Sequence, residues 1–232
     1  MLKIVIPCAG LGRRFLETGI QTPKPLIDVD GKPMVWRVIE SLRPRKDYQF
    51  VFIVQEAHCQ SHNIDFVLKR IEPNCEVVVI DKLTEGSGIT ILAAAHLFYN
   101  DEVIISVCDM ISKIDMDDFL KEARKKDGMM VTFETNETHF CFTEIDKDGN
   151  FVRCKEKEPI STHAQSGVWY FKNGAKMLSA LTEGISLNER TNNEFYSTIA
   201  YNHLKSKNIG IYNAEVIPLG TPKELDAYLC NK

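Results

Sequence analysis

The sequence has no long apolar run and no region of low complexity. No stretch approaches the roughly 20 apolar residues that a membrane-spanning helix needs. The apolar run in MLKIVIPCAG is too short for a signal peptide, and the charged residues Arg13 and Arg14 come soon after it. We therefore expect a cytoplasmic protein that makes no contact with a membrane.

Closely spaced cysteine pairs are also missing. The seven cysteines are odd in number, scattered along the chain and free of any C-x-x-C motif, and several lie in apolar runs such as SVCDM. This pattern is typical of reduced, buried thiols rather than of a disulfide framework. His58, Cys59 and His62 resemble part of a zinc site, but no fourth ligand lies near and the start of a helix explains them more simply.

An excess of positive charge is absent as well. The chain has 28 Lys and Arg against 32 Asp and Glu, a formal net charge of −4, so we expect no nucleic-acid partner. With 232 residues, 44% of them hydrophobic, it is long enough for one domain with a substantial core. Any anionic ligand must be held by a local cluster of cations, and the loop PCAGLGRRF (7–15) is one candidate.

Short β-branched runs alternate with amphipathic segments along the first half of the chain, and strand-like runs dominate the second. This order predicts an α/β fold: a Rossmann-like mixed, mainly parallel sheet flanked by helices, with a small substrate lobe inserted in the C-terminal half. The expected strands are 3–7, 50–55, 75–81, 102–109, 128–135, 139–146, 151–157, 167–172 and 208–217. The expected helices are 33–43, 63–72, 89–100, 174–182, 192–206 and one beginning at residue 222.

The loop at residues 7–15 comes after the first expected strand, which is where open α/β sheets bind ligands. Its two glycines let the backbone approach a phosphate closely, and its two arginines add charge. A dinucleotide site is disfavoured because Phe15 stands where the third glycine belongs and the prolines of TPKPL (22–26) break the helix expected after the loop. The P-loop pattern is absent, and a purely structural turn stays open.

Three motifs succeed one another near the start: AGLGRRF (9–15), TPKPL (22–26) and GKP (31–33). Together they resemble the nucleoside-triphosphate transferase family, the sugar-phosphate nucleotidylyltransferases, and the stretch 19–40 looks closest to the cytidylyltransferase branch. The resemblance implies that a phosphate oxygen of an acceptor attacks the α-phosphorus of a nucleoside triphosphate, with CTP favoured, and that pyrophosphate leaves. It also implies one domain over 1–232, with a nucleotide-binding half (1–110) and an acceptor-binding half (111–232).

The resemblance further implies roles for individual residues. The catalytic cations would be Arg13, Lys24 and Lys157. The nucleotide contacts would be Ala9, Gly10, Leu11, Gly12, Arg14, Glu85, Gly86 and Ser87, and the acceptor contacts His163, Gly167 and Glu194. A Mg²⁺ cofactor would be held by Asp109 and Glu215, the latter because Pro218 occupies the usual position of the second carboxylate.

Two other functions stay open. A glycosyltransferase of related fold that uses a nucleotide sugar expects a D-x-D motif, whereas CDMI (108–111) offers one aspartate. A non-catalytic nucleotide-binding regulator would not need Arg13, Lys24 and Asp109. The favoured acceptor is a phosphorylated small molecule, such as a sugar 1-phosphate or a phosphocholine-like alcohol phosphate, destined for a cell-surface polysaccharide. The oligomeric state is left open, a homodimer included.

Overall fold

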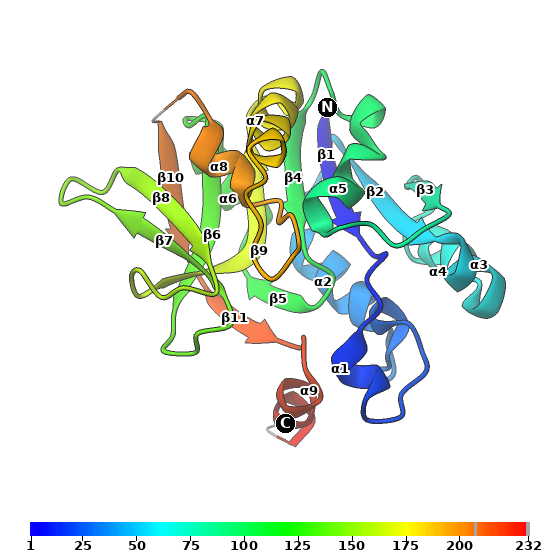
Figure 1. The fold of residues 1–232 in the computed structure, drawn as a ribbon. Coiled ribbons are helices and arrows are strands. Elements are labelled where there is room, and N and C mark those ends of the chain that lie inside the picture. Colours follow the sequence, from blue (N-terminus) through cyan, green and yellow to red (C-terminus); the bar gives the residue numbers. More distant parts are fainter. Residues whose placement is uncertain (207, 231–232) are drawn as a thin grey trace.

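A computed structural model describes residues 1–206 and 208–230, and its centre is a mixed sheet in the strand order β10-β6-β9-β4-β1-β2-β3 (Figure 1). These strands are β1 (Leu2–Pro7), β2 (Tyr48–Gln55), β3 (Glu76–Ile80), β4 (Glu102–Ser106), β6 (Gly128–Glu134), β9 (His163–Phe171) and β10 (Ile209–Asn213). A hairpin of β7 (Cys141–Ile145) and β8 (Phe151–Glu156) joins β9. A separate antiparallel pair consists of β5 (Met110–Lys113) and β11 (Glu215–Pro218).

Helices cover both faces of this sheet (Figure 1). They are α1 (Arg13–Leu16), η1 (Lys24–Leu26), α2 (Met34–Leu42), α3 (Glu56–His62), α4 (Ile64–Ile71), α5 (Ser87–Leu92), η2 (Ala95–Leu97), α6 (Met116–Ala123), α7 (Gly174–Ser186), α8 (Ile199–His203) and α9 (Pro222–Cys230). Strands β1 to β4 run parallel, and β9 runs antiparallel between β4 and β6. The predicted Rossmann-like, mainly parallel sheet is therefore confirmed. No described helix is long and apolar enough to cross a membrane.

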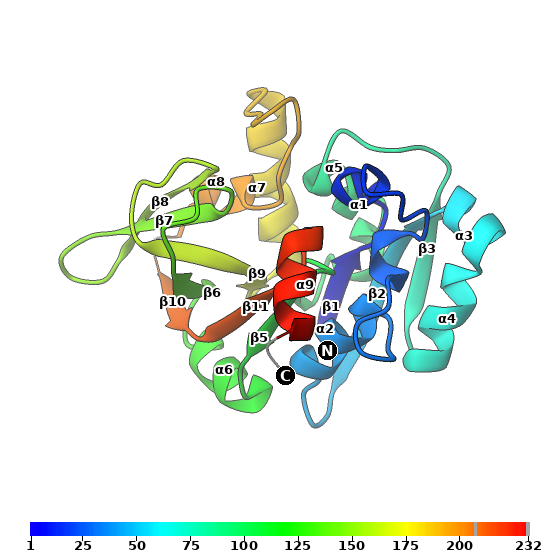
Figure 2. The same ribbon diagram turned by 90° about the horizontal axis from the view of Figure 1, so that it is seen from below.

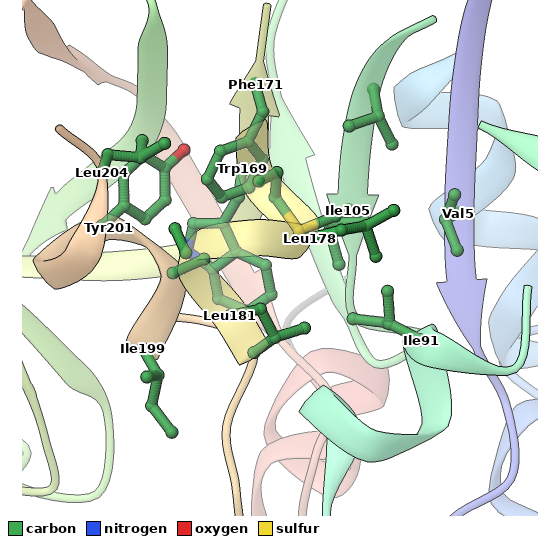
Figure 3. Packing of buried hydrophobic residues seen from close by; sticks show 14 of the residues in the cluster. Val5, Ile91, Ile105, Trp169, Phe171, Leu178, Leu181, Ile199, Tyr201 and Leu204 are labelled. Atoms are coloured by element: carbon green, nitrogen blue, oxygen red, sulfur yellow. The ribbon is translucent and has the colours of Figure 1, made fainter. Parts of the chain in front are cut away.

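Successive side chains of a strand point to opposite faces of the sheet, so the continuous apolar runs make both faces apolar. Ile4 and Ile6 of β1 lie in a core cluster with Val38 of α2, whereas Val5 lies in the opposite cluster with Ile91 of α5. Figure 3 shows this second cluster, where side chains of β1, β4 and β9 meet those of α5, α7 and α8. Both faces exclude water, so the sites left for a ligand are the ends of the strands.

Several predicted elements were wrong in extent, among them the helix expected at 89–100, which ends at Leu92 and is followed by η2. The strand expected at 102–109 ends at Ser106, and the short strand β5 begins after a bend. The strand expected at 208–217 is two strands in different sheets, because the chain leaves β6 after Asn213 and pairs with β5 instead. The helix expected at 192–206 is reduced to α8, because Asn192 and Asn193 adopt positive φ values of 51° and 63° before it.

The segment from β11 to α9 returns to the end of the sheet where β1 finishes. Seen from below, α9 lies in front of the parallel strands (Figure 2). Leu219 and Leu225 from this segment share a small apolar cluster with Phe15 of α1. This packing brings the C-terminal helix beside the glycine loop, although about 200 residues of sequence separate them.

Candidate active site

A cleft of about 580 Å³ opens at the carboxyl ends of β1 and β4. Its lining comes from the glycine loop, from the bend after β4, from the loop before α5 and from β8, β9 and α9. Parallel α/β sheets bind ligands at this edge because the strands end there and the chain turns back into helices. The volume is in the range of small-molecule sites.

The glycine loop forms one wall of the cleft. Gly12 has φ +63°, and a Cβ on Gly12 would lie 3.1 Å from the Cβ of Lys24, so the backbone conformation and the close approach both require glycine. Gly10 differs, because a Cβ there would meet no atom within 4 Å. The loop thus leaves open space at Gly10, while Arg13 and Arg14 stand exposed beside it.

Lys24 and Asp109 make a direct ion pair on the floor of the cleft. Burial alone would lower the pKa of Lys24, but the Asp109 carboxylate outweighs burial and raises this pKa above its ordinary value. The lysine is therefore a fixed cation at neutral pH. Its ammonium and the loop arginines are cations of the cleft, whose lining also carries the carboxylates of Asp109, Glu156, Glu194 and Glu224.

Asp109 is held by the segment that precedes α9. The backbone N–H of Leu219 donates to the Asp109 carbonyl (2.8 Å), and a Cβ on Gly220 would lie only 2.7 Å from Asp109 Oδ2. The same hypothetical Cβ would lie 3.5 Å from Oε2 of Glu224, whose other oxygen is 3.1 Å from His139 Nε2. The carboxylates of Asp109 and Glu224 therefore face a common region of the cleft.

The loop before α5 is fastened to the segment around Phe195. Gly86 has φ +116°, and a Cβ there would overlap the Phe195 carbonyl oxygen, so only glycine fits. Phe195 N–H donates to the Glu85 carbonyl (2.7 Å), and Gly88 N–H donates to the Phe195 carbonyl (2.8 Å). Backbone hydrogen bonds thus hold this loop and the segment around Phe195 together as one part of the cleft.

The side of the cleft opposite the glycine loop carries polar side chains that are joined by hydrogen bonds. The Lys157 ammonium donates to the Tyr196 hydroxyl (2.7 Å), which donates to Glu194 Oε2 (2.7 Å). Glu156, the last residue of β8, accepts a hydrogen bond from Thr198 (2.6 Å). Burial raises the pKa of Glu156 above its ordinary value despite this hydrogen bond.

Strand β9 closes the back of the cleft. Gly167 has φ +80°, and a Cβ on it would overlap Val107 Cγ2, so this bulge in β9 requires glycine. Trp169 Nε1 donates to Gln165 Oε1 (2.6 Å), and Gln165 Nε2 donates to Thr143 Oγ1 (2.8 Å). These side chains are buried and fully engaged, so they form a rigid surface rather than mobile contacts.

Most residues that the sequence nominated are brought together in this cleft, although their roles remain predictions. Those that line the cleft are Ala9, Gly10, Leu11, Gly12, Arg13, Arg14, Lys24, Gly86, Ser87, Asp109, Lys157, Gly167 and Glu194. Glu194 lies there from an irregular segment rather than from the predicted helix. They come from both halves of the chain, which supports one shared site.

Glu85 and His163 do not line the cleft. The exposed Glu85 carboxylate pairs with Arg190 (2.5 Å), so only its backbone serves the wall of the cleft. His163 is the first residue of β9, in register with Glu134, and the strand lines the cleft only farther along, with Gln165, Gly167 and Trp169. The predicted side-chain contacts of both residues are therefore not supported.

Glu215, which the sequence predicts as a metal ligand, lies outside the cleft. It begins β11, its side chain is 68% exposed, and its carboxylate pairs with Lys113 of β5 (2.5 Å) rather than lining the cleft. Pro218, at the end of the same strand, does line the cleft. The alternation of side chains along a strand and the exposed pairing with β5 direct the Glu215 carboxylate elsewhere.

Sequence reasoning missed Tyr196, His139 and Glu224, which all line the cleft. Tyr196 lies two residues after Glu194 in NNEFY, so that motif contained a usable signal. His139 precedes a hairpin strand, and Glu224 lies in the first turn of α9, so neither position has a local pattern that distinguishes it from a surface residue. Only the contact between His139 and Glu224 in the folded protein identifies them as residues of the cleft.

Comparison with known proteins explains this arrangement. Residues 4–190 match the model of the MobA-like NTP transferase domain. The chain belongs to this family. The match ends before Glu194 and Tyr196, so the family model does not cover that side of the cleft.

The chain is also similar to individual curated proteins and, in its fold, to a solved structure. The bifunctional protein GlmU of Methanocaldococcus jannaschii is 25% identical over 100% of this chain and 55% of its own length. Glucose-1-phosphate cytidylyltransferase of Salmonella typhi is 24% identical over 73% of this chain and 74% of its own, and choline-phosphate cytidylyltransferase of Haemophilus influenzae is 28% identical over 45% and 42%. The chain thus spans about half the length of the archaeal relative. The fold resembles a nucleoside-diphosphate-sugar pyrophosphorylase from Vibrio cholerae RC9, with a TM-score of 0.86, 22% identity and coverage of 98% and 99%.

Proposed function

We propose that this protein transfers a nucleoside monophosphate from a nucleoside triphosphate, CTP by preference, to a phosphorylated small molecule and releases pyrophosphate. The observation that carries the proposal is the convergence of the glycine loop, Lys24 and Asp109 on one side of a cleft that has Lys157 on the other. A triphosphate needs several cations and close backbone approach, whereas a phosphorylated acceptor needs a cation of its own. Family membership supports the same reaction class.

In this reaction an acceptor phosphate oxygen forms a bond to the α-phosphorus, and the bond from that phosphorus to the β-phosphate oxygen breaks. Arg13, Arg14 and Lys24 would neutralise the charge that develops on the departing pyrophosphate. Lys157 would orient the acceptor phosphate. No covalent nucleophile is required, because positioning and charge neutralisation supply most of the acceleration in such transfers.

The residues of the cleft fit a Mg²⁺ cofactor. Magnesium is usually bound through one or two carboxylates together with substrate phosphates, and Asp109 is a half-buried carboxylate beside the cations for the triphosphate. Glu224 replaces Glu215 as the candidate for a second carboxylate, because it faces the same region as Asp109. Within residues 1–206 and 208–230, no three His, Cys, Asp or Glu residues form a metal cage. Bound Mg²⁺ would add positive charge at the reacting phosphates.

The preference for CTP and the acceptor class rest on the relatives and on the motif spacing. Two of the relatives are named as cytidylyltransferases, one for glucose 1-phosphate and one for choline phosphate. A sugar 1-phosphate or an alcohol phosphate is therefore our proposed acceptor, with the product serving cell-surface polysaccharide synthesis in the cytoplasm. Both acceptor types present the phosphate dianion that Lys157 would contact.

The test is pyrophosphate release from each of the four nucleoside triphosphates, with a panel of sugar 1-phosphates and alcohol phosphates. We expect release that depends on Mg²⁺, stops with a chelator and is fastest with CTP. Asp109→Asn should abolish release, whereas Lys113→Ala, which removes an exposed ion pair outside the cleft, should not. Release of a free nucleoside diphosphate from a nucleotide sugar would identify a glycosyltransferase, and nucleotide binding without turnover would identify a regulator.

A further inference from the structure

The Tyr196 hydroxyl lies between a cation and an anion at the acceptor side of the cleft. It accepts a hydrogen bond from Lys157 Nζ (2.7 Å) and donates one to Glu194 Oε2 (2.7 Å). The same ammonium lies 5.1 Å from the centre of the Tyr196 ring, within the range of a cation–π contact. All three side chains line the cleft.

Lys157 is a residue whose position must be imposed by its surroundings. It comes directly after β8 with φ +59°, a left-handed conformation that is unfavourable for a residue other than glycine. Its N–H donates to the Phe140 carbonyl (2.8 Å), which holds the backbone, but a lysine side chain loses conformational entropy when it is fixed. Tyr196 provides the contact that orients the ammonium.

Tyr196 can orient Lys157 because its own backbone is anchored on both sides. Phe195 exchanges backbone hydrogen bonds with the loop before α5, and Ser197 N–H donates to Ser87 Oγ (3.2 Å). Arg190 strengthens the anchor, since its guanidinium lies 3.9 Å above the Phe195 ring. The tyrosine therefore projects from a segment that is held firmly against the loop before α5.

The chemistry of the hydroxyl suits this role. Burial, together with the Glu194 carboxylate, raises the pKa of Tyr196. The hydroxyl therefore keeps its proton and donates a hydrogen bond to Glu194. Its lone pairs then face the Lys157 ammonium, which has three N–H donors and uses one of them on Tyr196. The remaining donors are available to a phosphate.

Building on the proposed function, we propose that Tyr196 is the positioning residue of the acceptor site: its hydroxyl, oriented by Glu194, holds the Lys157 ammonium where the acceptor phosphate binds. The family model ends at residue 190, so it covers Lys157 but not Tyr196 or Glu194. Phe195 and Ser197 are held to the loop before α5 by backbone groups and by the Ser87 hydroxyl. Removal of the Tyr196 hydroxyl therefore leaves these hydrogen bonds, and with them the proposed nucleotide site, unchanged.

Tyr196→Phe tests the proposal. We expect kcat/KM for the acceptor to fall about 10- to 30-fold, the effect of one lost hydrogen bond to a charged group, with most of the change in the KM for the acceptor. The Kd for CTP and the Tm should stay at wild-type values. Tyr212→Phe is the matched control, because its hydroxyl also donates to a carboxylate, Asp118 (2.9 Å), but outside the cleft.

Two further measurements separate positioning from a structural effect. The double variant Lys157→Ala with Tyr196→Phe should be no slower than Lys157→Ala alone, because the hydroxyl acts only through the lysine. Acetylation of Lys157 by a water-soluble acylating reagent, measured by peptide mass spectrometry, should be faster in Tyr196→Phe than in the wild type. Equal labelling, or a loss of CTP affinity equal to the loss for the acceptor, would overturn the proposal.

The labelling experiment does not need turnover. If the wild type released no pyrophosphate with any pair of substrates, the proposed function would be wrong. Faster labelling of Lys157 in Tyr196→Phe would then still show that Tyr196 holds the ammonium, and unchanged labelling would refute that contact. The two hypotheses therefore fail on different measurements.

Discussion

The two walls of the cleft are built differently. The proposed nucleotide wall is the glycine loop together with Lys24, in which Gly12 lies against Lys24 and two arginines come directly after this glycine. The proposed acceptor wall consists of side chains of both signs from distant segments, joined as Lys157–Tyr196–Glu194. The first wall suits a polyanion that many backbone groups can surround, and the second suits a smaller ligand with one phosphate.

This difference means that substitutions in the two walls should fail in different ways. A cation removed from the nucleotide wall removes a contact to the triphosphate directly, because the charges there are concentrated around few residues. Removal of a side chain from the acceptor wall first leaves its hydrogen-bonding partner without that contact. Variants within and outside the cleft can test this contrast, and their expected effects range from several hundredfold to almost none.

Among the variants that compare the two walls, Lys24→Ala should have the largest effect. We expect kcat/KM for the nucleotide to fall about 10²- to 10³-fold, because a cation aimed at the transition-state charge is lost and the Asp109 carboxylate is left without its partner. Pyrophosphate release under steady-state conditions measures the change. Lys113→Ala serves as control, since it breaks an exposed lysine–carboxylate pair outside the cleft. Equal rates for both variants would remove Lys24 from the site.

Gly10→Ala should separate ligand binding from folding. A Cβ at Gly10 meets no protein atom within 4 Å, so the Tm should not change, while the Kd for the nucleotide should rise about tenfold because the methyl group occupies ligand space. Gly12→Ala is the contrasting variant, and it should lower the Tm as well, because φ +63° and the contact with Lys24 both disfavour alanine. Isothermal titration and thermal unfolding distinguish them. Full affinity in Gly10→Ala would place the phosphates elsewhere.

Glu156→Gln should stabilise the protein at neutral pH, because a carboxylate that is largely removed from water is costly to ionise. The pKa of Glu156 is raised above 4.5 in the folded state, so the folded form favours the protonated acid. The stability of the wild type relative to the variant is therefore greatest below pH 4.5 and is lost as the pH rises through the folded pKa. Chemical unfolding across this window measures the difference. Glu158→Gln, which changes an exposed glutamate two residues away, is the matched control variant.

Glu215→Gln should have the smallest effect. The ion pair with Lys113 is exposed, and such pairs contribute at most about 1 kcal/mol. We expect pyrophosphate release and its dependence on Mg²⁺ concentration to stay within about twofold of the wild type, while Glu224→Gln shifts the Mg²⁺ dependence to higher concentration. A strong effect of Glu215→Gln on the Mg²⁺ dependence would restore Glu215 as a ligand and exclude Glu224.

Much of the fold could be predicted from local patterns. The buried parallel strands appear as continuous apolar runs, because both of their faces are covered, and the amphipathic helices between them have a clear period. The predictions failed where pairing partners decide the outcome. The run 208–217 is uniformly strand-like, yet it divides at Asn213 between β6 and β5 because those two partners lie in different sheets.

The sequence by itself determined the nucleotide wall, since its glycines, arginines and Lys24 lie within 15 residues and the backbone conformation that they require is local. Only the tertiary structure decided the acceptor wall. It brought Tyr196 to Lys157 and Glu224 to the region of Asp109, and it directed Glu215 away. The physical reason is that a side-chain pair depends on which elements pack together, and packing between distant segments has no local signature in the sequence.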